Sequence, residues 1–353
     1  MSLPTKVIDC DVHNALTSPL ELVPYLPEPF ATRLRETGMM AVPNGWYSPA
    51  GPYRKDAIPP SGGAPGSDPD FVYEHLVKPY NMAYAMLLGD RIMNICNHPD
   101  ADYASALASA YNNWMIDKWL GTYKEFKGAL VVAPQDPHAA AREIDRLGGH
   151  PDIVQVMMGT GARMGYGQRF YHPIYEAAQR QGLPIILHPG AEGSGVSNAP
   201  TAAGYPSSYL EWHTSLSQNY MAHLLSLICE GVFAKYPGLK VVLAEGGIGW
   251  LPHLMWRLDK NYKALRAQVP WLTRMPSEYV RDHCFLTTQP IEEPADAKHL
   301  AYMFEMIDAE NILLFSSDYP HWDFDAPPQI LRKLSEEARE KIFYRNAKVL
   351  YQL

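Results

Sequence analysis

The sequence predicts a (β/α)8 TIM barrel with long rim insertions, on the basis of three observations. Eight short apolar runs alternate with amphipathic segments, at 7–12, 83–88, 129–133, 153–157, 184–188, 240–245, 284–287 and 312–316. Most of these runs are continuously apolar and β-branched, as are strands buried on both faces of a parallel sheet. The 353 residues suffice for one barrel of about 250 residues, with about 100 left for loops and termini. We therefore expect residues 1–353 to form a single barrel domain.

Helices are expected between the strands, at 101–120, 172–181 and 220–233. The helix at 172–181 is followed by Gly182 and Pro184, which stop a helix and lead into the next strand. An open doubly wound sheet is the alternative architecture. No GxGxxG motif follows the first strand, and this favours the closed barrel.

Two insertions interrupt the alternation of strands and helices. Residues 38–70 are rich in Pro and Gly, and residues 190–218 follow directly after His188. Loops of this length in a compact domain are functional or mobile. We expect both on the rim that carries the strand carboxyl ends, and for 38–70 a lid and a subunit contact arm are both open.

Composition excludes several classes of function. The net charge is -8 and no run of Lys or Arg is present, so a nucleic-acid backbone would be repelled. No stretch approaches the roughly 18 apolar residues of a membrane span, and no signal peptide is visible. The four cysteines form no CxxC pair and are expected to be buried free thiols. These features predict a cytoplasmic protein with a small-molecule substrate.

Polar side chains follow four of the predicted strands at the point where each strand ends. They are Asp9, Asp11 and His13 on the first strand, His188 on the fifth, Glu245 on the sixth, and Asp318 and His321 on the eighth. All strand carboxyl ends of a parallel barrel open on one rim, where active sites lie. Carboxylates and imidazoles gathered there without a cation would suffer unfavourable charge and desolvation. A divalent ion resolves that conflict, and these ligand types suit zinc, manganese or iron.

Four segments in this order carry a resemblance to a known family: IDCDVHN at 8–14, PIILHPG at 184–190, FAKYPGLKVVLAEGGIGWLPHLMWRLD at 233–259 and LFSSDYPHWD at 314–323. Over nearly the whole chain they resemble the amidohydrolase-2 branch of the amidohydrolase superfamily, the aminocarboxymuconate semialdehyde decarboxylase-like metal-dependent enzymes. The resemblance implies a metal bound by a first-strand pair, a fifth-strand His and an eighth-strand Asp. These positions map onto Asp11, His13, His188 and Asp318.

Three features depart from the family pattern. The first-strand pair is often His-x-His, and the acidic Asp11 in its place shifts the metal preference from zinc towards manganese or iron. The fourth strand, IVQVMM at 153–158, lacks the Lys that bridges metal pairs in binuclear amidohydrolases, so a Lys-bridged pair is excluded. The sixth-strand position that usually holds His in the decarboxylases is Glu245, which can serve as a general base or as a further ligand.

We interpret the chain as a metal-dependent hydrolase or non-oxidative decarboxylase acting on a small organic acid or related carbonyl compound. A single Mn²⁺ or Zn²⁺ would polarise the substrate oxygen and lower the pKa of bound water. Asp318 would bind the metal and shuttle the proton, and Glu245 would assist as acid or base. A homodimer or higher oligomer is expected.

Two alternatives stay open at this point. Glu245 and His321 are candidate additional ligands, and with them the set could hold two metals. Some members of the branch that resemble this pattern are dinuclear oxygenases, which implies a non-haem iron or iron/manganese monooxygenase hydroxylating a small carboxylic acid. Zinc cannot support dioxygen chemistry. The third reading is a catalytically silent metal-binding subunit, because a barrel can keep its ligands and lose its chemistry.

Overall fold

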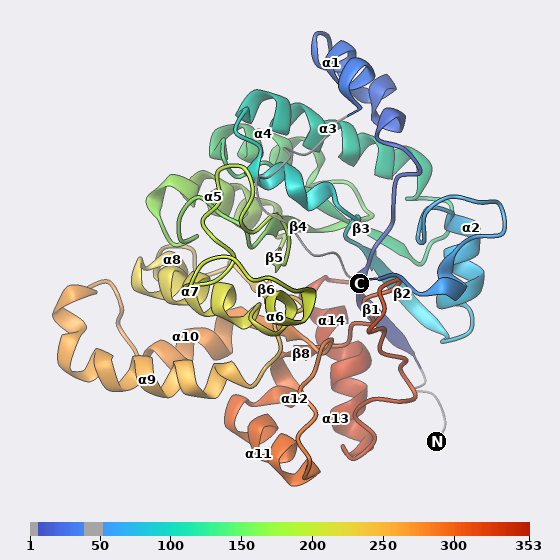
Figure 1. The fold of residues 1–353 in the computed structure, drawn as a ribbon. Helices are drawn as coiled ribbons and strands as arrows, with labels where there is room; N and C mark the ends of the chain where they lie inside the picture. Colours follow the sequence, from blue (N-terminus) through green and yellow to red (C-terminus); the bar gives the residue numbers. More distant parts are fainter. Residues whose placement is uncertain (1–5, 39–51) are drawn as a thin grey trace.

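Eight parallel strands, paired in chain order, form the centre of the molecule (Figure 1). The computed structural model describes residues 6–38 and 52–353. The strands are β1 (Val7–Val12), β2 (Met82–Leu87), β3 (Phe126–Val131), β4 (Ile153–Gly159), β5 (Ile185–His188), β6 (Val241–Leu243), β7 (Cys284–Thr287) and β8 (Leu313–Leu314). The predicted barrel is confirmed, because every predicted run contains or overlaps one of these strands.

The barrel comes to a near-complete closure between β8 and β1. Just beyond β8, Asp318 N–H donates to the carbonyl of Asp11 (3.1 Å), and His13 N–H donates to the carbonyl of Tyr319 (2.7 Å). The seam therefore consists of backbone hydrogen bonds between two segments that both carry predicted site residues.

Four strands end earlier than the sequence predicts. β2 ends one residue early, at Leu87, and β3, β6 and β8 end two residues early, at Val131, Leu243 and Leu314. The carbonyl of Phe315 still accepts a bond from Cys10 N–H of β1 (2.9 Å), but Phe315 N–H bonds to the carbonyl of Ile342 (3.0 Å), so a segment near the C-terminus takes one of its two backbone groups. An apolar run shows that a segment is buried, but it does not show which backbone partner it takes.

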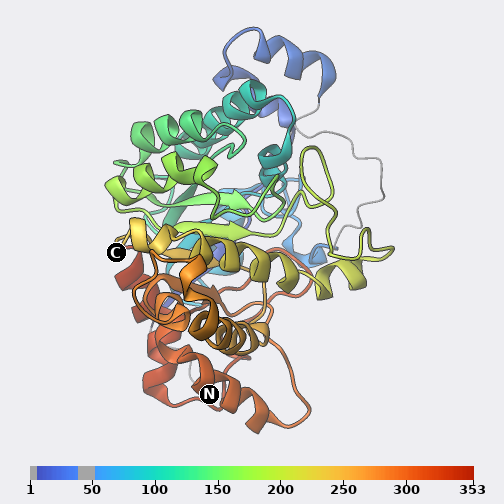
Figure 2. The ribbon, with the colours of Figure 1, turned by 90° about the vertical axis from the view of Figure 1, so that its left-hand side faces the viewer.

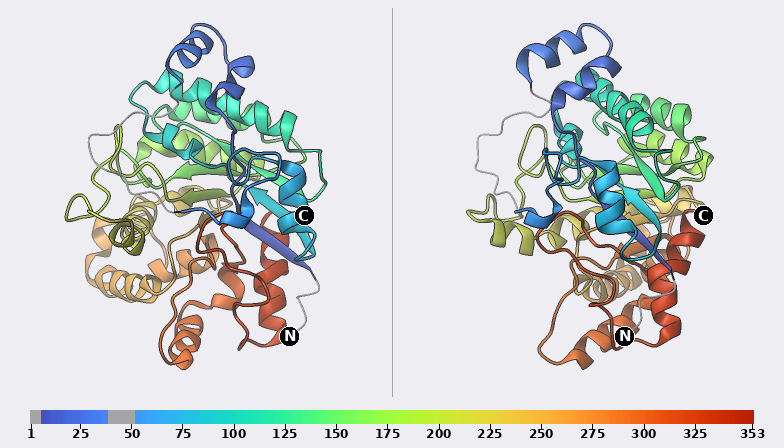
Figure 3. Two further views of the ribbon diagram at one scale, coloured as in Figure 1. Left: turned by 45° about the vertical axis from the view of Figure 1, so that its right-hand side comes forward. Right: turned by 90° about the vertical axis from the view of Figure 1, so that its right-hand side faces the viewer.

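Helices surround the strands in the order expected of a β/α barrel. They are α1 (Phe30–Thr37), α2 (Pro69–Val72), α3 (Ala101–Lys118), α4 (Pro137–Leu147), α5 (His172–Gln181), α6 (Tyr209–Thr214), α7 (Ser217–Cys229), α8 (Val232–Lys235), α9 (Trp250–Leu265), α10 (Pro276–His283), α11 (Ala297–Ile307), α12 (Ala309–Ile312), α13 (Glu336–Glu340) and α14 (Asn346–Leu350). The expected helix at 220–233 is interrupted by Gly231, whose φ of 76° separates α7 from α8. Figure 3 shows α1 at the outer edge of the molecule, near α3.

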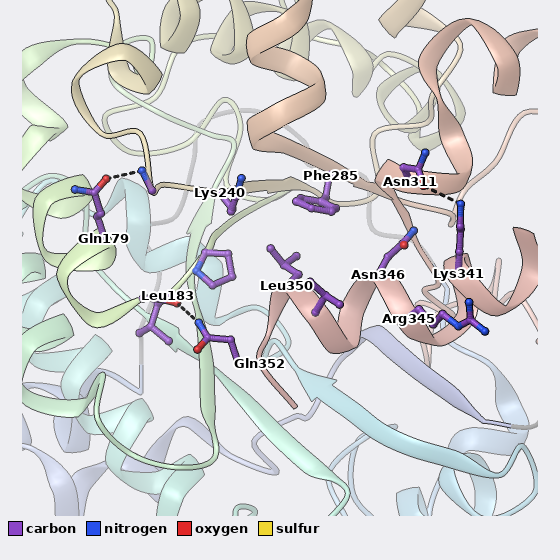
Figure 4. Close-up of a pocket in the computed structure, with 14 residues that line it drawn as sticks. Gln179, Leu183, Lys240, Phe285, Asn311, Lys341, Arg345, Asn346, Leu350 and Gln352 are labelled. Atoms are coloured by element: carbon purple, nitrogen blue, oxygen red, sulfur yellow. Dashed lines mark hydrogen bonds between the residues drawn. The ribbon is translucent and has the colours of Figure 1, made fainter.

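The two ends of the barrel are built differently. Figure 2 shows segment 190–218, which includes α6, on the side away from the C-terminus. At the other end of the barrel, near the C-terminus of the chain, a cavity of about 560 Å³ lies where β5, β6 and β8 begin (Figure 4). The basic side chains of this cavity are already bonded, Lys240 to the carbonyl of Asp282, Lys341 to Glu310 and Arg345 to Glu340. It lies at the opposite end of the strands from the predicted metal ligands.

The predicted free thiols are confirmed, although one of the four is only partly buried. All four cysteines are free, with Cys10, Cys96 and Cys284 buried and Cys229 half-buried. Within residues 6–38 and 52–353, no helix has both the length and the apolar character required to cross a membrane.

Candidate metal centre

Asp11, His13, His188 and Asp318 meet at the carboxyl ends of β1, β5 and β8. All four side chains are buried. His13 Nε2 lies 3.1 Å from Asp11 Oδ1 and 3.0 Å from Asp318 Oδ1. His188 Nε2 lies 3.3 Å from Asp11 Oδ2. The two carboxylate oxygens of Asp11 therefore face different imidazoles, and the residues predicted from separate strands form one cluster.

Four of the potential ligand atoms in this cluster have no hydrogen-bond partner in the described part of the chain. Within the described part of the chain, His13 Nε2, His188 Nε2 and both carboxylate oxygens of Asp11 are buried without a hydrogen bond. The other ring nitrogen of each histidine donates to a backbone carbonyl, His13 Nδ1–H to Gly89 (2.8 Å) and His188 Nδ1–H to Pro189 (2.9 Å). These bonds fix the tautomer that leaves the Nε2 lone pair free for a metal. The residues thus fit a bound divalent cation.

The pKa shifts of His13 and Asp318 also indicate a site for a cation. Burial on its own lowers the pKa of His13, but the carboxylates of Asp11 and Asp318 raise it well above its usual value. Burial on its own raises the pKa of Asp318, but the imidazoles of His321 and His13 lower it below its ordinary value. A cation between these groups would neutralise the buried carboxylates without protonating the imidazoles.

Two site residues adopt a left-handed backbone conformation that side chains other than Gly rarely take. Glu245 has φ 59° and Asp318 has φ 58°. Glu245 N–H donates to the hydroxyl of Thr287 (3.0 Å), and Asp318 N–H joins the barrel seam. Such strain is retained where the surrounding structure enforces it, often at functional sites. It also explains why β6 ends before Glu245.

Glu245 connects the cluster to two residues that the sequence analysis missed. Its Oε2 lies 3.2 Å from His188 Nε2, and its Oε1 accepts a hydrogen bond from His213 Nε2–H (3.2 Å). Asp323 Oδ2 lies 3.5 Å from the same His213 nitrogen. Burial lowers the pKa of His213, but the two carboxylates raise it overall. Two features of the sequence could have pointed to these residues. His213 lies in insertion 190–218, and Asp323 ends the LFSSDYPHWD segment.

His321 lies against the cluster. Its Nδ1–H donates to Asp318 Oδ1 (2.7 Å), and its ring centroid is 4.5 Å from that of His13. The ring of Tyr53 stacks on His321 at 5.1 Å. The hydrogen bond supports Asp318 in place, and His321 also lies within a group of potential ligands with His13 and Asp318.

Both insertions contact this rim in their described parts. Arg54 N–H donates to the carbonyl of Pro320 (3.0 Å), and Ala15 N–H donates to that of Gly66 (2.8 Å). Insertion 190–218 contributes His213. Residues 39–51 of the first insertion lie outside the described residues. The division of the chain into one domain with two insertions stays a prediction.

Gly66 allows the first insertion to approach the metal cluster. Its φ is +78°, and a Cβ there would lie 2.3 Å from the carbonyl oxygen of His13. We expect Gly66→Ala to lower the free energy of unfolding in urea by more than about 2 kcal/mol, through backbone strain and displacement of the His13 loop. Gly62 is a matched control, because it also has a positive φ (+87°) but no atom within 4 Å of a Cβ. Gly62→Ala should cost only about 1 kcal/mol, and equal losses in the two variants would contradict the expectation.

Comparison with known proteins identifies the family. A family model described as amidohydrolase matches residues 8–353. The chain is a member of the amidohydrolase-2 family. This amidohydrolase-2 enzyme is 28% identical over 265 residues to gamma-resorcylate decarboxylase from Polaromonas sp., covering 72% of this chain and 78% of that protein.

Solved structures share the fold of this amidohydrolase-2 enzyme. An amidohydrolase from Mycobacterium avium subsp. paratuberculosis has a TM-score of 0.73 and 20% identity, over 99% of this chain and 100% of that chain. A dihydroxybenzoic acid decarboxylase from Polaromonas sp., with bound manganese and the inhibitor 2-nitroresorcinol, has a TM-score of 0.67 and 20% identity, over 99% and 97% of the two chains. The predicted family and divalent-metal dependence agree with these relatives. The oxygenase alternative receives no support from them.

Proposed function

We propose that this amidohydrolase-2 enzyme is a Mn²⁺-dependent, non-oxidative decarboxylase of small aromatic carboxylic acids. The observation that carries the proposal is the buried cluster of Asp11, His13 and His188, whose ligand atoms have no hydrogen-bond partner among residues 6–38 and 52–353. Asp11, an oxygen ligand where the family often has a histidine, shifts the preference from zinc towards manganese. The reaction type is that of the decarboxylases to which the chain is similar.

Asp11, His13, His188 and Asp318 would hold the ion at the barrel mouth. When bound, a divalent ion supplies Lewis-acid stabilisation of negative charge on a substrate oxygen. The protein contributes fixed imidazole tautomers, a dry site and carboxylates that remain ionised. The imidazoles of His321 and His13 lower the pKa of Asp318, which keeps it ionised as a metal ligand. We also assign it as the proton shuttle, because a carboxyl group with a low pKa readily passes on a proton that it takes from the substrate.

Decarboxylation also requires a proton donor for the carbon that loses CO₂. The carbon–carboxylate bond breaks, its electron pair remains on the carbon, and a proton forms the new C–H bond. Glu245 and His213 share a proton next to His188, with His213 Nε2–H donating to Glu245 Oε1. We assign Glu245 as the acid–base group and His213 as the residue that keeps it supplied with a proton. Proton transfer by a positioned group contributes about 10²–10⁴-fold to rate.

Aromatic side chains near Glu245 favour a flat substrate. The ring of Tyr209 stacks on His213 at a centroid distance of 5.2 Å, and Trp322 Nε1–H donates to the Tyr209 hydroxyl (3.3 Å). Trp322 is 49% exposed, so part of this aromatic group faces solvent. Offset stacking on such a surface suits a benzoate ring better than an aliphatic acid.

The test uses metal-free protein reloaded with Mn²⁺ and a panel of hydroxybenzoates that includes 2,6-dihydroxybenzoate, the ligand of one structurally similar decarboxylase. Under nitrogen, we expect loss of substrate absorbance with stoichiometric CO₂ release, and no turnover by His188→Ala. Turnover that requires dioxygen, or hydrolysis of aryl esters or amides without CO₂ release, would contradict the proposal.

We also propose that the enzyme acts as a homodimer or higher oligomer on small molecules alone. Rim insertions of large barrels can pair subunits as well as cover the site, and closed homo-oligomers are common among soluble enzymes. Light scattering coupled to size exclusion measures the mass directly.

A further inference from the structure

Asp9 is a buried carboxylate that the proposed reaction does not use. It lies on β1 two residues before Asp11 and has no exposed surface. Its Oδ1 accepts two backbone hydrogen bonds, from Asp11 N–H (3.2 Å) and from Ser317 N–H (2.9 Å). This single oxygen atom thus holds the backbone of two segments. One bond is to Asp11 itself, and the other is to Ser317, which directly precedes Asp318.

These two bonds lie at the least regular part of the barrel. β8 contains only Leu313–Leu314, and beyond it the chain reaches β1 through single backbone bonds, such as Cys10 N–H to the carbonyl of Phe315 (2.9 Å). Asp318 must then take its left-handed conformation (φ 58°) to direct its carboxylate at His13. A conformation of this kind costs about 1–3 kcal/mol and persists only when neighbouring bonds enforce it.

We propose that Asp9 is a positioning residue, a carboxylate clamp that joins β1 to the segment after β8 and so fixes the separation of Asp11 and Asp318. The inference rests on the proposed metal centre and adds to it a residue that touches neither metal nor substrate. Residues behind the metal ligands affect binding because they fix ligand orientation, and losing one typically weakens metal affinity about 10–100-fold.

Only one of the two carboxylate oxygens of Asp9 makes the clamp bonds, so its role can be tested apart from the negative charge. Within the described residues, Asp9 Oδ2 is buried and has no hydrogen-bond partner, whereas Oδ1 makes both clamp bonds. Asn keeps an oxygen at Oδ1 with nearly the same shape. Asp9→Asn should therefore retain the clamp, whereas Asp9→Ala and the similarly sized Asp9→Leu remove it.

The experiment measures Mn²⁺ affinity by following the free-ion electron paramagnetic resonance signal during titration of metal-free protein. We expect Asp9→Ala and Asp9→Leu to raise the Kd for Mn²⁺ by about 10–100-fold, and Asp9→Asn to stay close to wild type. Circular dichroism and thermal unfolding of the metal-free variants establish that the barrel is folded. Two clamp-removing variants are used because a cavity in the alanine variant can admit a water.

Asp259 provides the matched control for a general loss of stability. It also receives hydrogen bonds across two elements, since Ser277 N–H of α10 donates to its Oδ1 (2.9 Å) and the Ser277 hydroxyl to its Oδ2 (2.7 Å). Asp259→Ala should lower the Tm and leave Mn²⁺ affinity unchanged. The clamp would be overturned, and the metal centre kept, by either of two results. One is a folded Asp9→Leu variant that binds Mn²⁺ as tightly as the wild type. The other is an Asp9→Asn variant whose Mn²⁺ affinity is as weak as that of Asp9→Ala. Absence of Mn²⁺ binding by the wild type would overturn the metal centre and the clamp with it.

Discussion

Replacing His188 by alanine is expected to remove most of the bound metal while the barrel stays folded. His188 is the only fifth-strand residue in the cluster formed by the described residues, and its loss removes the imidazole that faces Asp11 Oδ2 and Glu245 Oε2. We expect metal affinity to fall more than about 100-fold, since even residues behind the ligands contribute 10–100-fold. Elemental analysis of protein purified without chelators gives the stoichiometry, and circular dichroism reports the fold.

His283 serves as the control for this variant. It is also a buried imidazole that bonds to a backbone carbonyl, that of Leu239 (2.8 Å), but it lies where β7 begins, at the other end of the barrel. His283→Ala should lose stability and keep its metal. Full metal occupancy in His188→Ala would show that the cluster is not the metal site.

Replacing Glu245 by glutamine is expected to keep about one bound ion per chain and to lower decarboxylation by about 10²–10⁴-fold. Glutamine retains the size and one carbonyl oxygen of Glu245, but it has neither the negative charge nor the basicity. It therefore still accepts the hydrogen bond from His213 but cannot carry a proton. Metal content and turnover are measured on the same preparation.

The same variant distinguishes the decarboxylase from the dinuclear oxygenase. His13, Asp318 and His321 form a second group of potential ligands beside Asp11, His13 and His188. Two ions would need Glu245 and His321 as direct ligands, because the other four residues cannot saturate both. If the wild type holds two ions, and Glu245→Gln or His321→Ala releases one of them, the decarboxylase proposal should be dropped in favour of the oxygenase.

The architecture and the principal ligand positions followed from local sequence patterns. Buried parallel strands are continuously apolar, so their order along the chain could be read without knowing any contact. A parallel barrel then brings all strand carboxyl ends to one rim, and this made the convergence of Asp11, His188 and Asp318 predictable. The exact ends of β6 and β8 could not be predicted, because the left-handed conformation at Glu245 and the bond from Phe315 to Ile342 depend on partners elsewhere in the chain.

The tertiary structure alone revealed the residues around the ligands. His213 reaches Glu245 from an insertion whose path has no periodic signal, and Asp323 approaches it from a loop beyond β8. Asp9 shares a strand face with Asp11 and His13, but its role depends on a hydrogen bond from Ser317, 308 positions away in the chain. Strand positions are set by the hydrophobicity of neighbouring residues, which the sequence displays. Contacts between loops are set by hydrogen bonds over long chain separations, which only the folded chain brings together.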